Sequence, residues 1–219
     1  MSDIPPWSHS TLTSFETCAR RHYLTKVARE IKEPQTEATI WGNFVHKSLE
    51  ERVRDDKPLP ESIKGYEPIV FKVSNTNGEK LVEHKLALDA NFQPTAWQGS
   101  WGRGIVDLGI LRESSAVMLD WKTGKRKTDS DQLKLMALLA MHTYPQVDKV
   151  MTGFVWLKDN KVDKQVFTRQ QIGELWQDFL PRVRRLEAAY KQNKWPPKPS
   201  GLCRNYCPCI GCEFNGKTR

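Results

Sequence analysis

The sequence lacks the features that would place it in a membrane or outside the cell. It has no run of about 18 consecutive apolar residues, the length that a membrane-spanning helix requires. No basic segment followed by an apolar stretch is found near Met1, so we expect no secretory signal and a cytoplasmic location. It also contains no Gly-x-x-x-x-Gly-Lys-Ser/Thr motif, so we expect no motor of that type in this chain.

Acidic residues are outnumbered by basic ones. The 219 residues include 34 Lys and Arg against 26 Asp and Glu, which gives a net charge of +8 and a pI near 9.3. Such an excess favours a polyanionic partner, because contacts with a phosphate backbone release counterions. The eight tryptophans are many for this length, and exposed ones offer surfaces on which bases stack.

The length suits a single domain, residues 1–219, with or without a small appended lobe, and the order of the predicted elements indicates a mixed α/β fold. Apolar residues recur at helical spacing in four segments, 10–30, 38–55, 131–144 and 168–192. Short apolar or alternating runs bounded by turn residues predict strands over 69–73, 80–89, 103–112, 115–121, 147–158 and 162–168. The proline-containing stretch 56–68 is expected to be a loop.

Two of these predicted strands form a hairpin that carries Asp107, Asp120 and Lys122. Residues two apart on a strand share a face, so Asp120 and Lys122 point the same way. Asp107 lies on the neighbouring strand, about 4.8 Å away. Asp-x-Lys alone is usually a solvated strand face or a surface ion pair. Here both acids lie within apolar runs, where an unpaired charge is costly, and this favours a site.

Two carboxylates and an ammonium group suit the hydrolysis of phosphodiesters. Carboxylate oxygens bind Mg²⁺ or Mn²⁺ and leave positions open for water. The metal polarises a phosphate and lowers the pKa of the bound water, and the ammonium of Lys122 orients that water or stabilises developing charge. The main-chain carbonyl of Trp121, between Asp120 and Lys122, is a further candidate ligand.

The motifs resemble the RecB-like branch of the PD-(D/E)XK nuclease superfamily. The matching segments span nearly the whole chain, and they are Thr11–Cys18, Trp41–Glu50, Gly104–Leu108, Leu119–Gly124 and the helix that opens at Gln132. The resemblance implies a restriction-endonuclease-like core, with a mixed sheet flanked by helices. It also implies that His46 is a metal ligand, that Glu83 is an additional catalytic acid, and that Gln132 contacts the active site or DNA.

Four of the five cysteines lie within ten residues, Cys203, Cys207, Cys209 and Cys212, which indicates a centre for a soft metal. An odd cysteine count in a chain with no export signal argues against a disulfide framework. The resemblance implies a 4Fe–4S cluster held by Cys18 together with Cys203, Cys207 and Cys212. Zinc is the alternative, because its thiolate sites accept similar spacings, and Cys209 is a fifth thiol that could replace a neighbour.

This resemblance implies a lobe of residues 1–35 and 195–219, stapled by the cluster, beside a nuclease core of residues 36–194. The expected function is a metal-dependent DNA exonuclease that acts on single strands or DNA ends, similar to stand-alone phage or CRISPR-adaptation nucleases in a bacterial or phage-infected cell. Its expected partners are DNA and a helicase, recombinase or single-strand-binding protein. A non-catalytic DNA-binding module with an iron–sulfur or zinc staple is the alternative, and a sequence-recognising endonuclease is a third hypothesis.

Overall fold

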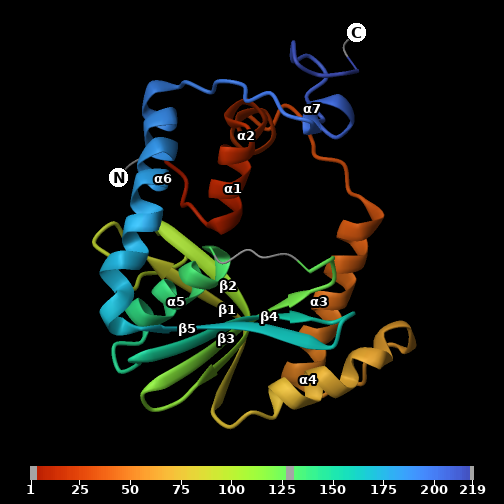
Figure 1. Cartoon of the computed structure of the whole chain (residues 1–219), viewed down its shortest axis with the longest axis vertical. Coiled ribbons are helices and arrows are strands. Elements are labelled where there is room, and N and C mark those ends of the chain that lie inside the picture. Colours follow the sequence, from red (N-terminus) through yellow and green to blue (C-terminus); the bar gives the residue numbers. More distant parts are fainter. Residues whose placement is uncertain (1–3, 127–130, 218–219) are drawn as a thin grey trace. The chain divides into compact units, whose positions relative to one another are not determined.

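The computed structural model describes residues 4–126 and 131–217 (Figure 1). These residues form two compact units, one of residues 36–177 and one of residues up to 35 together with 178 onward. No helix in the described ranges is both long and apolar enough to cross a membrane.

The 36–177 unit is built on a five-stranded mixed sheet in the order β1-β2-β3-β4-β5. Its strands are β1 (Glu79–Leu88), β2 (Gly102–Leu111), β3 (Ser115–Lys122), β4 (Lys149–Trp156) and β5 (Lys161–Thr168). Neighbouring strands are antiparallel except β3 and β4, which run parallel. A parallel pair needs a crossover connection, and α5 (Asp131–Thr143) supplies it. The mixed α/β fold predicted from the sequence is confirmed.

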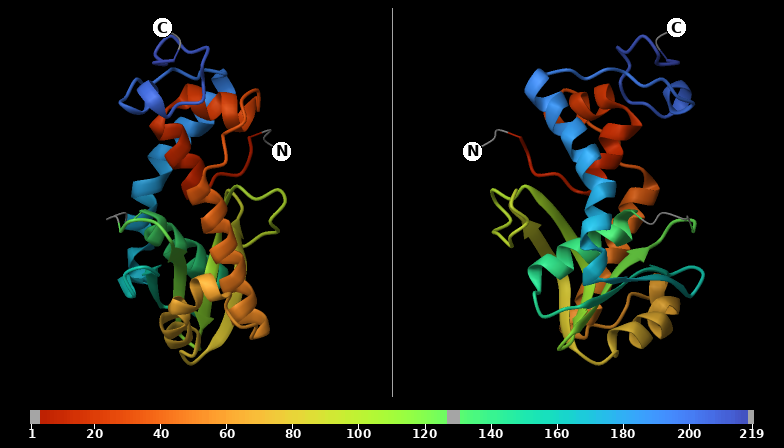
Figure 2. Two further views of the ribbon diagram at one scale, coloured as in Figure 1. Left: turned by 90° about the vertical axis from the view of Figure 1, so that its right-hand side faces the viewer. Right: turned by 60° about the vertical axis from the view of Figure 1, so that its left-hand side comes forward.

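Helices cover both faces of this sheet (Figures 1 and 2). On one face, α3 (Glu37–Asp55), the 3-10 helix η2 (Glu61–Tyr66) and α4 (Glu67–Ser74) pack on a buried apolar cluster that includes Leu108, Leu119 and Trp121. The other face is covered by α5, which is apolar nearly all round because it is itself buried. Helix α3 begins where the Thr36 hydroxyl accepts a hydrogen bond from the Thr39 amide, and it ends at Asp56 in the left-handed conformation.

Three predicted elements are wrong. Residues 69–73 are not a strand but part of α4, which begins with Glu67 and Pro68 in its first turn and buries Ile69 and Val70. The loop predicted over 56–68 contains the 3-10 helix η2. The single helix predicted over 10–30 is interrupted at Cys18, which is extended with φ −166°.

The interruption at Cys18 divides that segment into α1 (His9–Thr17), α2 (Ala19–His22) and the π-helical turn η1 (Tyr23–Val27), all in the second unit. This unit also holds residues 178–192 of α6 (Ile172–Gln192) and the short helix α7 (Leu202–Asn205). Glu16 joins α1 to α6 through two hydrogen bonds of 2.7 Å from Arg182. Helix α6 follows η3 (Arg169–Gln171), a 3-10 turn with a capping box at Thr168.

Candidate active site

Strands β1 and β2 share an irregularity at Glu83 and Asp107. Their register pairs Val82 with Leu108 and His84 with Val106, so Glu83 lies opposite Asp107 at a position without regular pairing. Glu83 has a φ of 50°, in the left-handed region that costs a residue with a side chain about 1–2 kcal/mol. Backbone strain of this kind persists only where the surroundings enforce it, and it is concentrated at functional sites.

The irregularity reverses the alternation of faces along β2. Leu108 belongs to the cluster packed against α3 and α4. Gly104 lies four residues before Leu108 and would face the same side in a regular strand. It faces α5 instead, as a Cβ at Gly104 would lie 2.8 Å from Leu139 Cδ1. After the reversal, Ile105 and Asp107 line the same pocket as His46, on the α3 side of the sheet.

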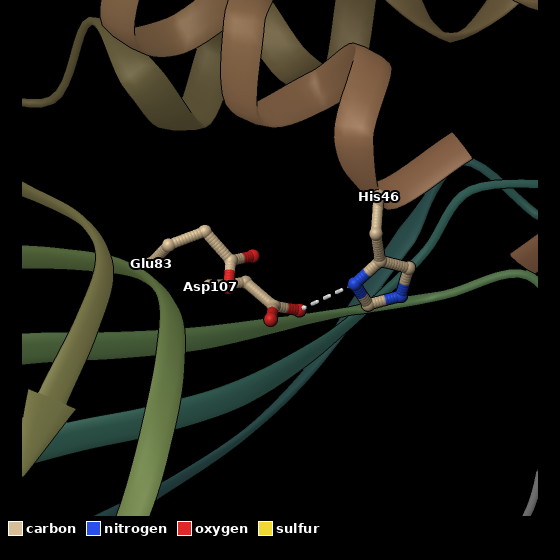
Figure 3. A group of neighbouring side chains, drawn as sticks. All are labelled: His46, Glu83 and Asp107. Carbon is tan, nitrogen blue, oxygen red and sulfur yellow. Dashed lines mark ion pairs between the residues drawn. The ribbon is translucent and has the colours of Figure 1, made fainter. Parts of the chain in front are cut away.

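His46, Glu83 and Asp107 form a candidate metal site (Figure 3). One ligand atom from each residue lies within 4.8 Å of the other two. His46 Nδ1 is 3.3 Å from Asp107 Oδ2. The three side chains line an open pocket of about 520 Å³, which is roomy enough to admit a substrate as well as an ion.

Asp120, Lys122 and Gln132 form a second, connected group. Lys122 Nζ lies 2.7 Å from Asp120 Oδ2 and donates to Gln132 Oε1 at 2.9 Å. The Gln132 amide nitrogen donates to Asp120 Oδ1, which closes a ring of three polar contacts. The Lys122 ammonium also lies 4.7 Å from the centre of the Phe154 ring. The lysine is therefore held in one place by partners from three elements, β3, β4 and α5.

The two groups meet at the main chain of Trp121. Its amide donates a buried hydrogen bond of 2.7 Å to Asp107 Oδ2. This bond fixes the Asp107 carboxylate against the residue between Asp120 and Lys122. The role predicted for the Trp121 carbonyl as a metal ligand stays a prediction.

The electrostatics of the site reflect an excess of buried negative charge. Burial first, and then the charge of Asp107, raise the pKa of Asp120 to about 6, although Lys122 opposes this. Burial and the neighbouring Asp107 and Glu50 also raise the pKa of Glu83. Burial opposes the charging of His46, but the hydrogen bond and the charge of Asp107 outweigh it and raise the pKa of that imidazole. A cation placed among these groups would relieve the repulsion.

The donor set fits a divalent cation. Carboxylate oxygens are the ligands that Mg²⁺ and Mn²⁺ favour, and an imidazole nitrogen beside them is compatible with Mn²⁺. His46 and Asp107 are already in contact, so little side-chain ordering remains when an ion binds.

All five cysteines line one small pocket in the other unit, beside Pro197 and Lys198. The Cys18 sulfur accepts the Lys198 amide at 3.4 Å, and the Cys203 sulfur accepts the Ser200 amide at 3.4 Å. Sulfurs that accept amide hydrogen bonds are suited to carrying negative charge.

The spacing of these thiols is wider than a single ion requires. Within the described residues, no three cysteine sulfurs lie within 4.8 Å of one another. In a tetrahedral zinc site, sulfurs about 2.3 Å from the metal would lie about 3.8 Å apart. Cys209 also differs from the rest, because burial and the neighbouring Cys207 raise its pKa to about 12, and a neutral thiol is a poor ligand.

Comparison with known proteins defines the class. The family model of the PD-(D/E)XK nuclease superfamily matches residues 6–212, so the chain belongs to this superfamily and is a nuclease.

Among solved structures, a candidate exonuclease from Eubacterium rectale is similar with a TM-score of 0.53 and 14% identity, covering 92% of this chain and 86% of that one. The crystal structure of the protein SSO0001 is similar with a TM-score of 0.52 and 13% identity, covering 98% of this chain and 89% of that one. At these identities the likeness shows the fold alone. No curated protein matches the chain significantly.

Proposed function

We propose that the protein is a metal-dependent DNA exonuclease that hydrolyses phosphodiester bonds on single strands or at DNA ends. The observation that carries this proposal is the hydrogen bond from the Trp121 amide to Asp107. It joins the candidate metal site to Asp120 and Lys122, the aspartate and the lysine of the superfamily motif. A substrate phosphate at the open pocket would therefore lie between hard metal ligands and a fixed ammonium group.

The side chains of the site have three roles in this scheme, which are to hold the metal, to supply positive charge and to keep these groups in position. His46, Glu83, Asp107 and Asp120 would hold Mg²⁺ or Mn²⁺, which polarises the phosphate and makes a bound water acidic. Lys122 orients the attacking water and places positive charge where negative charge develops on the phosphate. Gln132 accepts from Lys122 and donates to Asp120, so it keeps both groups in position. Because Lys122 is preorganised, its charge is delivered without reorganisation during the reaction.

An exonuclease is favoured over a sequence-specific endonuclease by the description of the Eubacterium rectale relative, a candidate exonuclease. We place the protein in the cytoplasm, acting alone or beside a helicase, recombinase or single-strand-binding protein that supplies DNA ends.

In the cysteine unit, we propose a 4Fe–4S cluster held by Cys18, Cys203, Cys207 and Cys212. The wide spacing of the thiols supports a cluster over a single zinc ion. Cys18 follows α1, whereas the other three lie in the C-terminal segment, so the cluster would cross-link the two ends of this unit. Its role is structural, because hydrolysis requires no electron transfer. Iron and acid-labile sulfide in protein purified without oxygen test the cluster, and stoichiometric zinc instead would overturn it.

The nuclease proposal is tested with end-labelled single- and double-stranded DNA in Mg²⁺, Mn²⁺ or chelator. We expect metal-dependent release of nucleotides from DNA ends, abolished by Asp120→Ala with DNA binding retained. Internal cuts in circular single-stranded DNA would exclude the exonuclease assignment. Binding without cleavage in either metal would instead identify the alternative, a non-catalytic DNA-binding module with an iron–sulfur or zinc staple.

A further inference from the structure

Beyond the metal site, β1 and β2 carry two cations on the pocket side of the sheet. Lys85 pairs with Ile105 across the strands, and Arg103 lies two residues before Ile105 on β2. Cross-strand partners share a face, so Lys85 lies on the face of Ile105, which lines the metal pocket. Arg103 is four strand residues from Asp107, or about 13 Å. The cations therefore continue the surface that begins at the metal site.

Both cations are held at one indole ring instead of by acids. The Arg103 guanidinium lies 4.5 Å from the centre of the Trp97 ring, and the Lys85 ammonium lies 5.5 Å from it. Arg103 also donates to the Trp97 carbonyl at 3.5 Å. Within the described ranges neither cation has an ion pair with a carboxylate, although many other basic residues of this chain do, Arg52, Arg126 and Arg182 among them. Their charge is thus available to a ligand.

The connection that presents Trp97 is a built structure and not a loose loop. This yellow-green segment joins β1 to β2 in Figure 2. Asp89 Oδ1 accepts the amides of Asn91 and Gln93 at 2.8 Å each. The Phe92 ring packs 4.6 Å from Trp176 and 5.7 Å from Trp101, centre to centre. Anchoring of this kind keeps the indole in place and lowers the entropy cost of binding.

Exposure also distinguishes this part of the sheet. Ile105 is 42% exposed, whereas most of β2 beyond it is buried. An exposed apolar side chain beside Lys85, and between Arg103 and the metal site, matches the alternation of sugar or base surface and phosphate along a nucleic-acid strand. An acidic protein surface would satisfy the cations but would not explain their alignment with the metal site.

We propose that Lys85, Trp97 and Arg103 form a phosphate clamp that holds a single DNA strand a few nucleotides from the cleaved bond. The proposal rests on the proposed function, because it assigns a path to the substrate of that site. Lys85 and Arg103 bind phosphates of the strand. Trp97 is a positioning residue, which keeps the two cations at the spacing the strand requires.

The test measures binding of a long fluorescent oligothymidylate in chelator at several salt concentrations, so that no cleavage occurs. Each lost phosphate contact lowers the slope of log affinity against log salt by about 0.7 for a single strand. We expect Lys85→Gln with Arg103→Gln to lower that slope by about 1.4 and to weaken binding at low salt. Lys72→Gln, which removes an exposed lysine on α4, is the matched control and should leave the slope unchanged.

Trp97→Leu separates positioning from charge. It leaves both cations in the chain but no longer holds them at the spacing of the strand, so we expect weaker binding and a salt slope between those of the wild type and the double variant. In Mg²⁺ or Mn²⁺, the double variant should lose kcat/KM on the long oligothymidylate and keep it on dithymidylate, which is too short to reach both cations. Equal losses on both substrates would show damage to the metal site and overturn the clamp, as would a wild-type salt slope in the double variant.

Failure of the clamp is distinguishable from failure of the proposed nuclease. If the wild-type protein binds the strand with the clamp-dependent slope but cleaves nothing in either metal, the nuclease assignment fails and the clamp stands. If it cleaves, and the double variant binds and cleaves as the wild type does, the clamp fails and the nuclease assignment stands.

Discussion

Asp107 Oδ2 accepts the backbone amide of Trp121 at 2.7 Å and also lies 3.3 Å from the imidazole of His46. A single carboxylate oxygen thus connects the strand that carries Asp120 and Lys122 to the helix that carries His46. Because a buried amide would be left unpaired if this oxygen were removed, Asp107 has a structural role in addition to its proposed role in metal binding.

The two roles of Asp107 are separated by comparing two variants. Asp107→Asn keeps an oxygen that can accept the Trp121 amide, whereas Asp107→Ala leaves that amide unsatisfied. Both variants should lose metal-dependent cleavage, since both lose a charged ligand. Urea unfolding in chelator should show Asp107→Ala to be less stable than Asp107→Asn by about 1–3 kcal/mol. Equal stabilities would show that water replaces the lost acceptor.

The left-handed backbone at Glu83 predicts an unusual order of stability. At φ 50° a side chain is strained, so Glu83→Gly should be more stable than Glu83→Ala by about 1 kcal/mol. The neighbouring Lys85 is the matched control, because its φ is not in the left-handed region. At this position, Lys85→Ala should be more stable than Lys85→Gly by about 0.5–1 kcal/mol. The same order at both positions would mean that Glu83 is not strained in solution.

The pattern of apolar residues predicted most of the sheet and the approach of Lys122 to Asp120, because both depend on spacing within one strand. It failed at residues 69–73, where a short apolar run fits a strand or a buried helix equally well. In the structure this run is helical, and Ile69 and Val70 are buried in the apolar cluster against which α3 packs.

Glu83 lies beside Asp107 because the strand reverses its faces there. The sequence does not indicate this reversal, because the residue with the left-handed backbone is a glutamate and not a glycine. The family resemblance, and not the hydrophobic pattern, pointed to Glu83 and His46. The grouping of Trp97 with Lys85 and Arg103 was missed for a similar reason, because it depends on how a thirteen-residue connection folds back on its strands. A tryptophan between turn residues was the one signal available.

The raised pKa of Asp120 predicts a pH dependence in the metal-free protein. The folded-state pKa of about 6 lies above the ordinary value of 3.8, so the native state binds this proton more tightly than the unfolded chain does. The contribution of Asp120 to stability is therefore lost as the pH rises through about 4 to about 6, by at most about 3 kcal/mol. His46, whose pKa is also raised, acts in the same direction at higher pH.

Urea unfolding in chelator across this range isolates the Asp120 effect as the difference between wild type and Asp120→Asn. The free energy of unfolding of Asp120→Asn should increase relative to that of the wild type as the pH increases. Saturating Mn²⁺ should remove this increase, because the cation neutralises the repulsion, and Mn²⁺ affinity should fall as the pH drops below about 6. A difference that does not change with pH would mean that Asp120 titrates normally.

The cysteines are predicted to divide into four ligands and one bystander. Cys209 is 2% exposed and its pKa is raised to about 12, whereas Cys18 and Cys203 are only partly buried and accept amide hydrogen bonds. We expect Cys209→Ser to retain iron and sulfide at wild-type levels after anaerobic purification. Single serine variants of Cys18, Cys203, Cys207 and Cys212 should each lose iron and lower the melting temperature, because the cross-link between the two ends of this unit is lost.

Cys209→Ser is a demanding control for this assignment, because it changes a thiol two residues from Cys207 and removes a buried sulfur. Its main-chain carbonyl accepts Asn215 Nδ2 at 2.9 Å, a contact that serine leaves intact, so the local turn should persist. Loss of iron in Cys209→Ser together with its retention in Cys207→Ser would exchange the two residues in the ligand set. Such a result would place the cluster deeper in the pocket and make Cys207, not Cys209, the spare thiol.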